Sequence, residues 1–219
     1  MPAPPPPAAA ALLDVLDGLS RGLNHALSNR VNTLNTLLAV LQDCEEFDRE
    51  IVDALAAEEA RFESLLQLYR LFPLDVNEAR EPLILADPVA DALALFAHHL
   101  DLRMLPCEVS GLESAPPVRC QRRMLTQAIL VMLVAVGRAM SGDDQGPGLN
   151  LSIRSRDDQV ILHAGTARDA DSEDANACVA LNWLASTIGA AYSCGRDDLG
   201  RPWVELALPT LAAERKGGR

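Results

Sequence analysis

The chain has 219 residues, of which 49% are hydrophobic and only 4% aromatic, and its formal net charge is −12. This composition predicts a folded protein with an aliphatic core. The negative charge argues against nucleic acid and an anionic membrane surface as partners, since both are bound through clustered lysine and arginine. The five cysteines have no CxxC spacing, which indicates a reduced, cytoplasmic chain without disulfides or a zinc site. No stretch has the length and apolarity of a membrane span.

The first part of the chain predicts a tail and a long helix. Residues 1–11 are rich in proline and alanine and lack the basic segment of a signal peptide, so a disordered tail is expected. Leu12 to Leu41 contains no proline and is predicted to form one helix about 45 Å long. Its apolar residues recur at steps of three and four, as in a heptad seam. The seam consists of Leu12, Leu16, Leu19, Leu23, Leu27, Val31, Leu34, Leu38 and Leu41.

A second helix is predicted from Phe47 to Phe72, where Pro73 ends it. Glu58 interrupts the apolar seam of this helix. Because the link between the two helices is short, residues 12–73 are expected to form an antiparallel hairpin. Two such hairpins complete a four-helix bundle most simply when two copies of the chain associate, which predicts a homodimer.

Residues 82–210 follow a linker at Asp75 to Arg80 and have a different pattern. Gln121 to Met140 is apolar nearly all round, so this helix is expected to be buried. Helices and mostly antiparallel strands in this order predict an α+β fold, with the helices on one face of a sheet. Residues 211–219 are expected to be a disordered tail. The predicted helices are Pro88–Leu102, Gln121–Met140 and Asn176–Ile188, and the predicted strands are Cys107–Ser110, Val118–Cys120, Leu149–Arg154, Gln159–His163, Ala191–Cys194 and Trp203–Leu208.

His25 is the candidate site residue of the hairpin. It lies two residues from both Leu23 and Leu27, and at about 100° per residue this places it opposite the apolar seam, where it faces water. Imidazole titrates near neutral pH, so an exposed histidine is partly neutral and nucleophilic. Ser28 and Asn29 follow on the same face, within reach of the ring or of phosphoryl oxygens, and Asn32 extends this polar stripe.

A helical hairpin carrying a histidine, followed by an α/β sandwich, resembles the core of the histidine kinases. The stretch Asn24-His25-Ala26-Leu27-Ser28-Asn29 is similar to the phosphoacceptor motif of that family, His-Asp/Glu-Leu-x-Asn. Leu125 to Met140 resembles the helix that carries the family's N box, and Leu181 to Leu208 resembles its final helix and strand pair. The resemblance covers Leu12 to Pro209 and depends on the order of the elements more than on residue identity.

The chain departs from the family at the residues that bind ATP. The N-box asparagine, a magnesium ligand, corresponds to Ala135, which offers no oxygen. The Asp-x-Gly motif corresponds to His163-Ala164-Gly165, without the aspartate. The glycine-rich segment corresponds to Ala177-Cys178-Val179-Ala180, whose side chains crowd the approach of phosphate. A loop of four carboxylates that would repel a triphosphate contains Asp169, Asp171, Glu173 and Asp174. The resemblance therefore implies a degenerate ATPase domain without a cofactor.

In the kinases, an acidic residue follows the histidine and acts as a base during attack on ATP. Here it is Ala26, which accepts no proton. The resemblance implies a histidine phosphotransfer protein, similar to the dimeric carriers of the ChpT type. His25 would exchange a phosphoryl group with response-regulator receiver domains, which supply the Mg²⁺. The docking surface would consist of Asn24, Ser28, Asn29 and Asn32.

Two alternatives stay open. One is a catalytically inactive, kinase-like scaffold that binds a protein partner. The other is an ATP-dependent sensor histidine kinase core with atypical motifs. His98 and His99, with Asp101 nearby, suggest a metal site, but adjacent side chains on a helix diverge by about 100°, which favours a capping or surface role.

Overall fold

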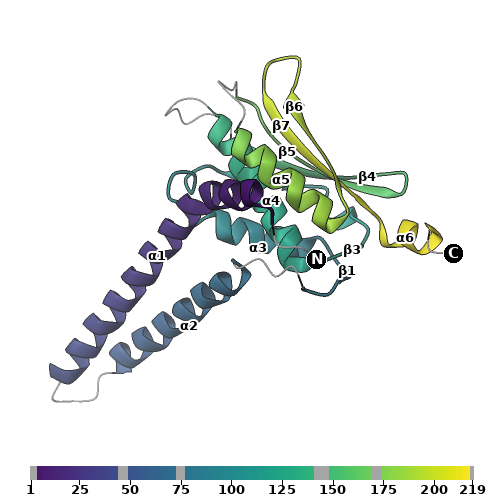
Figure 1. Ribbon diagram of the computed structural model, residues 1–219. Helices are drawn as coiled ribbons and strands as arrows, with labels where there is room; N and C mark the ends of the chain where they lie inside the picture. Colours follow the sequence, from purple (N-terminus) through teal and green to yellow (C-terminus); the bar gives the residue numbers. More distant parts are fainter. Residues whose placement is uncertain (1–3, 44–48, 73–76, 141–147, 169–173, 218–219) are drawn as a thin grey trace.

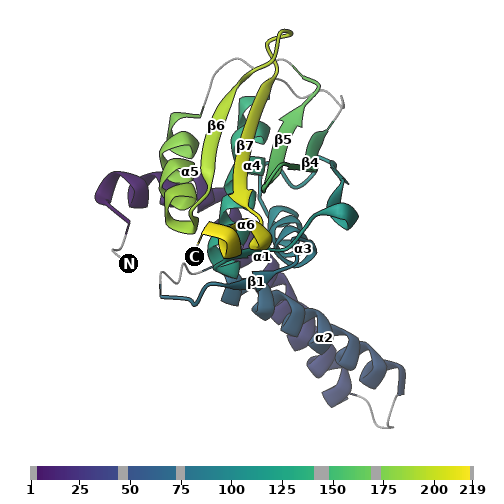
Figure 2. The same cartoon turned by 90° about the vertical axis from the view of Figure 1, so that its right-hand side faces the viewer.

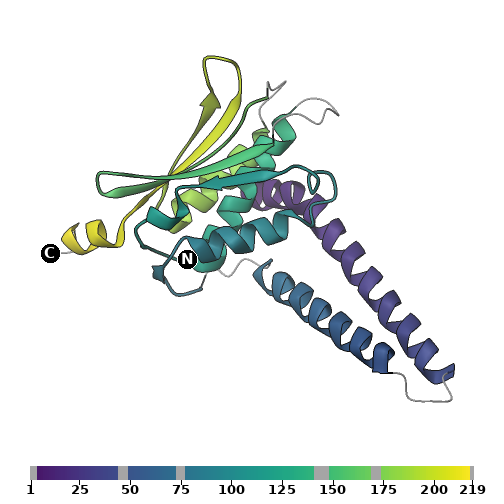
Figure 3. The same cartoon turned by 180° about the vertical axis from the view of Figure 1, so that it is seen from behind.

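The computed structural model describes residues 4–43, 49–72, 77–140, 148–168 and 174–217 (Figure 1). The protein is α+β, as predicted. A helical hairpin formed by α1 (Pro6–Asp43) and α2 (Arg49–Leu71) is followed by helices packed on one face of a sheet. Seen from behind, the far end of the hairpin projects away from the sandwich (Figure 3). Among the described helices, none is long and apolar enough to cross a membrane.

The sheet has five strands in the order β2-β4-β5-β7-β6. β2 pairs in parallel with β4, and the other neighbours are antiparallel. β4 and β5 form the predicted hairpin, in which Asp157 adopts a positive φ of 54° at the turn. Aspartate tolerates this left-handed conformation better than most residues. The strands are β2 (Cys107–Ser110), β4 (Leu149–Arg156), β5 (Gln159–Thr166), β6 (Ala191–Arg196) and β7 (Pro202–Pro209).

Three helices cover one face of this sheet (Figure 2). They are α3 (Ala86–Phe96), α4 (Arg122–Ala139) and α5 (Ala175–Ile188). α4 lies between the other two, and almost every side chain from Met124 to Gly137 is buried, as its uniformly apolar sequence predicts. The apolar core is therefore centred on α4.

The predicted boundaries are wrong in three places. α1 begins at Pro6 and its Ala8 is buried, so the tail predicted for residues 1–11 is largely helical, because alanine favours helix and proline is tolerated in the first turn. A helix, α6 (Leu211–Gly217), replaces most of the other predicted tail. α3 ends at Phe96 and not at Leu102. Also unpredicted are η1 (Leu112–Ser114) and β1 (Glu81–Leu83), which pairs with β3 (Val118–Cys120).

The seam of α1 is divided between two environments. Leu12, Leu16, Leu19 and Leu23 belong to the same buried cluster as the side chains of α4, and this half of the helix packs against α5. Further along, Val31 is 41% exposed and Leu38 is 46% exposed. Only the second half of the predicted seam is therefore open to another molecule.

Two glycines allow the turn after α3 to approach α1 closely. The backbone N–H of Leu100 donates to the carbonyl oxygen of Gly18 at 3.1 Å. A Cβ atom on Gly22 would lie 1.7 Å from the carbonyl oxygen of His98, and one on Gly18 would lie 2.5 Å from the ring of His99. Larger residues at these positions would force α1 away from α3, so both glycines set how the hairpin sits on the sandwich.

Candidate functional site

His25 lies on an exposed face of α1, as its spacing from the seam predicts. It follows Gly22 by three residues, so it lies on the same face about one turn beyond the contact with His98. A partner that approaches the ring therefore meets the end of α3 as well as the hairpin. The other predicted docking residues are also exposed on α1: Asn24, Ser28, Asn29 and Asn32.

The ring of His25 is oriented by Asn29. The amide nitrogen Nδ2 of Asn29 lies 3.2 Å from Nε2 of His25. This contact holds the exposed ring in one orientation and places a hydrogen-bonding amide beside the nitrogen that faces outward. A neutral imidazole nitrogen is a nucleophile, so the ring is positioned for covalent chemistry with a partner.

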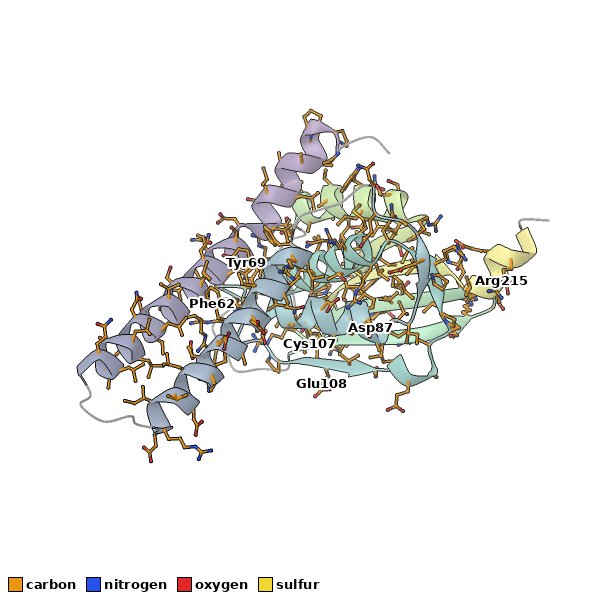
Figure 4. The ribbon with its side chains drawn as sticks, turned by 90° about the horizontal axis from the view of Figure 1, so that it is seen from below. Phe62, Tyr69, Asp87, Cys107, Glu108 and Arg215 are labelled. Atoms are coloured by element: carbon orange, nitrogen blue, oxygen red, sulfur yellow. The ribbon has the colours of Figure 1, made fainter. Side chains whose placement is uncertain are left out.

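Asn24 connects the site to the second helix. The hydroxyl of Tyr69 donates to Oδ1 of Asn24 at 2.6 Å, and Tyr69 extends from α2 towards α1 (Figure 4). Burial raises the pKa of Tyr69, which keeps this hydroxyl protonated and able to donate. Ser28 donates to the backbone oxygen of Asn24 at 3.0 Å. Sequence reasoning placed Tyr69 only in the apolar seam, because a contact between residues 45 positions apart leaves no local pattern.

From His25 towards the far end of the hairpin, the surface of α1 is polar and almost free of charge. Between Asn24 and Leu41, Arg30 is the only charged residue apart from the titratable His25. The exposed side chains of this stretch are mostly amides and hydroxyls, which form hydrogen bonds with either sign of charge. Such a surface does not repel a phosphoryl group or the acidic pocket of a partner.

Arg30 itself points towards α2 and binds Glu58. Nη1 of Arg30 lies 3.1 Å from Oε1 of Glu58, and Arg61 lies 3.2 Å from Oε2. Glu58 is only 1% exposed. Burial alone would raise the pKa of Glu58, but the hydrogen bonds from Arg30 and Arg61 outweigh it, and the pKa is lowered from its ordinary value of 4.5. The glutamate that interrupts the seam is therefore an ionised link between the two hairpin helices.

A small cavity lies beside Ala135, the residue that the sequence matches to the N-box asparagine. In the described part of the chain, the cavity between α4, α5, β6 and β7 has a volume of about 30 Å³. Sites for small molecules and cofactors usually measure about 300–1,000 Å³. The cavity is lined by Ala135 together with Cys178, Tyr192, Cys194 and Trp203. Of the predicted acidic loop, Asp169, Asp171 and Glu173 lie outside the described residues.

Asp174 caps α5 and takes part in a polar clamp, which we define as Asp14, Arg138, Asp174 and Asn176. Its Oδ1 accepts a hydrogen bond from the backbone N–H of Ala177 at 3.0 Å. Arg138 lies 3.3 Å from Asp174 and 3.1 Å from Asp14. Hydrogen bonds from Asn176 and then Arg138 lower the pKa of Asp14, so this carboxylate stays charged at neutral pH. A helix N-terminus that would otherwise attract phosphate is thus occupied by the protein's own carboxylate.

His163, the residue matched to the aspartate of the Asp-x-Gly motif, binds a neighbouring strand. Nδ1 of His163 lies 3.0 Å from Oε1 of Glu205, its cross-strand partner, and the ring stacks on Trp203 with centroids 6.0 Å apart. Ala164, the next residue on β5, is buried. Since successive side chains of a strand face opposite sides of the sheet, His163 lies on the face away from the core helices.

His99 lies in the interior, whereas the sequence favoured a capping or surface role for His98 and His99. His99 is fully buried, and its Nδ1 accepts a hydrogen bond from the backbone N–H of Asp101 at 3.3 Å. Burial lowers the pKa of both histidines, with Arg30 as a further cause for His98, so both rings are neutral at physiological pH. In the described segments of the chain, no group of three or more His, Cys, Asp or Glu residues could hold a metal ion.

No protein-family model matches the chain, and no curated protein matches it. It is similar in arrangement to the Acinetobacter baumannii histidine kinase AdeS, with 15% identity, 85% of this chain and 98% of that chain covered, and a TM-score of 0.47. It is also similar to full-length ShkA in complex with AMPPNP, with 16% identity, 86% of this chain and 46% of that chain covered, and a TM-score of 0.46. A bacterial phosphotransferase has 15% identity to it, with 89% of this chain and 96% of that chain covered and a TM-score of 0.39. Values this low do not establish a shared function, which has to be argued from the site.

Proposed function

We propose that this protein is a histidine phosphotransfer protein in which His25 exchanges a phosphoryl group with the aspartate of response-regulator receiver domains. The observation that carries the proposal is the exposed His25 ring, whose Nε2 lies 3.2 Å from the amide of Asn29 on a polar stretch of α1. This arrangement combines a nucleophile, a hydrogen-bond donor beside it and room for a partner.

The transfer would use few protein groups. The lone pair of Nε2 attacks the phosphorus atom of an aspartyl phosphate, the bond from phosphorus to the carboxyl oxygen breaks, and the aspartate leaves as a carboxylate. For this attack the amide of Asn29, 3.2 Å from Nε2, has to release the ring nitrogen, and it is then close enough to donate to an oxygen of the transferred group. The receiver domain would supply the Mg²⁺, and the reverse attack by the carboxylate returns the phosphoryl group.

Several features support a carrier that takes no phosphate from ATP. The cavity beside Ala135 is about 30 Å³ in the described part of the chain, and Asp174 occupies the N-terminus of α5. Ala26 follows the nucleophile, so the usual base for attack on ATP is missing. These features favour the carrier over the sensor kinase alternative. The labelling experiment described below distinguishes the carrier from the inactive scaffold.

The proposed carrier is a homodimer joined by the outer half of the hairpin. Val31 and Leu38 are seven residues apart, so they lie on one face of α1 about two turns from each other. Both are large apolar residues with more than 40% exposure. A second hairpin would bury this face, whereas the inner half of the seam already packs on the sandwich.

The dimer is tested by the double change Val31→Glu and Leu38→Glu. We expect sedimentation equilibrium to show a dimer for the wild type and a monomer for this variant, because the carboxylates would lose hydration in the interface. Leu13→Glu is the control, since Leu13 is 76% exposed in the inner half of α1. If Leu13→Glu dissociated the dimer and the double variant did not, the interface would lie on the inner half of α1 and the proposed position would be wrong.

The carrier function is tested with labelled phosphate. The full chain and its His25→Ala variant are incubated with labelled ATP and, separately, with phosphorylated receiver domains encoded by the same genome. We expect acid-labile label on the wild type from at least one receiver, complete loss of that label in His25→Ala, and no label from ATP.

Each other outcome has a definite meaning. Label from ATP that requires His25 would show a kinase. No label from any receiver or from ATP would support the inactive scaffold. Label that persists in His25→Ala would show that another residue carries the phosphoryl group.

A further inference from the structure

Two cysteines meet inside the sandwich. Cys178 in α5 and Cys194 in β6 are 16 residues apart in the chain, and their Sγ atoms lie 3.9 Å apart. Both side chains line the small cavity between α4 and the sheet. A disulfide needs an Sγ–Sγ distance of about 2.05 Å, so the sulfur atoms have to approach by about 2 Å, which is within the range of side-chain rotation.

The described cysteines differ in exposure and in reactivity. Cys178 and Cys194 are both partly exposed, as is Cys107, whereas Cys120 is buried. Cys178 is the fourth residue of α5, one turn after the capping residue Asp174. Burial raises the pKa of Cys107 to about 11 and that of Cys120 to about 12, so these two thiols stay protonated and poorly reactive.

We propose that Cys178 and Cys194 are a reversible redox site that forms an intramolecular disulfide with a small-molecule disulfide, such as oxidised glutathione, as the oxidant. One thiolate attacks the oxidant and releases the first glutathione thiolate, which leaves a mixed disulfide. The second cysteine then attacks the protein's sulfur atom in this mixed disulfide. The Cys178–Cys194 bond forms, and the second glutathione leaves as a thiolate. The protein loses two hydrogen atoms, and the oxidant is reduced to two thiols.

The bridge would join α5 to β6, the strand that follows it in the chain. α5 holds the first half of α1 through Asn176 of the polar clamp, and β6 is an edge strand that pairs only with β7 in the described sheet. A covalent link between them removes conformations from the unfolded chain and closes the side of the sandwich that faces the small cavity. This site does not depend on the proposed phosphotransfer function.

The test uses the full chain with Cys44→Ser, because Cys44 lies outside the described residues and must not compete for the oxidant. The protein is equilibrated in glutathione buffers of increasing oxidising potential, alkylated, and mapped by peptide mass spectrometry. We expect most molecules to carry the Cys178–Cys194 bridge at potentials where Cys107 and Cys120 remain alkylated as free thiols. Dithiothreitol should restore both thiols.

Two matched variants test whether the bridge requires Cys178. In Cys178→Ser, Cys194 should become a mixed disulfide with glutathione, whereas Cys107→Ser should still form the bridge. Circular dichroism of each serine variant checks that its fold is retained. The proposal is overturned if the wild-type pair stays alkylated across the series, or if each cysteine takes up glutathione separately without a bridge.

Discussion

Alanine in place of Gly22 is expected to lower the free energy of unfolding by about 3 kcal/mol, which corresponds to a fall in melting temperature of about 6–12 °C for a chain of this size. In a helix interior, glycine to alanine normally stabilises by up to about 1 kcal/mol. Here the added Cβ would lie 1.7 Å from the backbone oxygen of His98, which no side-chain rotation relieves. The helix and the turn after α3 would have to separate.

Gly137→Ala is the matched control for this prediction. Gly137 is also inside a helix, but a Cβ there would first meet the side-chain methyl groups of Leu102, at 3.1 and 3.4 Å. A leucine side chain adjusts by a few tenths of an ångström at little cost, so the change in stability should stay within about 1 kcal/mol. Thermal unfolding followed by circular dichroism measures both variants. An equal change in melting temperature for Gly22→Ala and Gly137→Ala would mean that α1 does not contact the turn after α3 as described.

The contact at Gly22 also matters for the proposed function. It holds the sandwich beside the face that presents His25, about one turn away. A receiver domain would then dock on a composite surface made by α1 and the turn after α3. Loss of this contact should therefore weaken docking even where His25 and Asn29 are intact.

Arg30→Met is expected to lower the melting temperature by several degrees at neutral pH. Removal of this arginine leaves the carboxylate of Glu58, which is 1% exposed, paired with Arg61 alone among the described residues. A buried carboxylate with too few partners is strongly unfavourable. The double variant Arg30→Met and Glu58→Leu should recover most of the loss, because the charge is then removed together with its partner.

The effect of Arg30→Met should depend on pH. The pKa of Glu58 is lowered in the folded protein, so the ion pair contributes fully above the ordinary value of 4.5 and is lost as the pH falls through the lower folded value. The gap in melting temperature between wild type and Arg30→Met should therefore narrow below pH 4.5.

A surface pair provides the control for Arg30→Met. In Arg21→Met, the lost partners are Asp17 and Asp101, and all three side chains are more than half exposed. The melting temperature should change by only about 1–2 °C, because exposed ion pairs contribute little. A loss in Arg21→Met as large as that in Arg30→Met would contradict the buried ion pair between the helices.

The repeating pattern of apolar residues was enough to predict the main elements. It predicted both hairpin helices, the buried α4 and the exposed position of His25, because the period of a helix fixes which residues share a face. The turn between β4 and β5 was also predicted, since Asp157 and Asp158 interrupt two alternating strands. The tail predicted for residues 1–11 was wrong because composition does not reveal that Ala8 and Ala11 find a surface to pack on.

The sequence by itself determined that α1 has one apolar face and that His25 lies opposite it. Only the tertiary structure decided what covers that face: the protein's own sandwich for Leu12 to Leu23, and solvent around Val31 and Leu38. It also decided that Tyr69 binds Asn24, that Arg30 neutralises Glu58 and that Cys178 meets Cys194. The physical reason is that periodicity depends on neighbours along one element, whereas each of these contacts joins residues whose separation in the chain is bridged only when the elements pack.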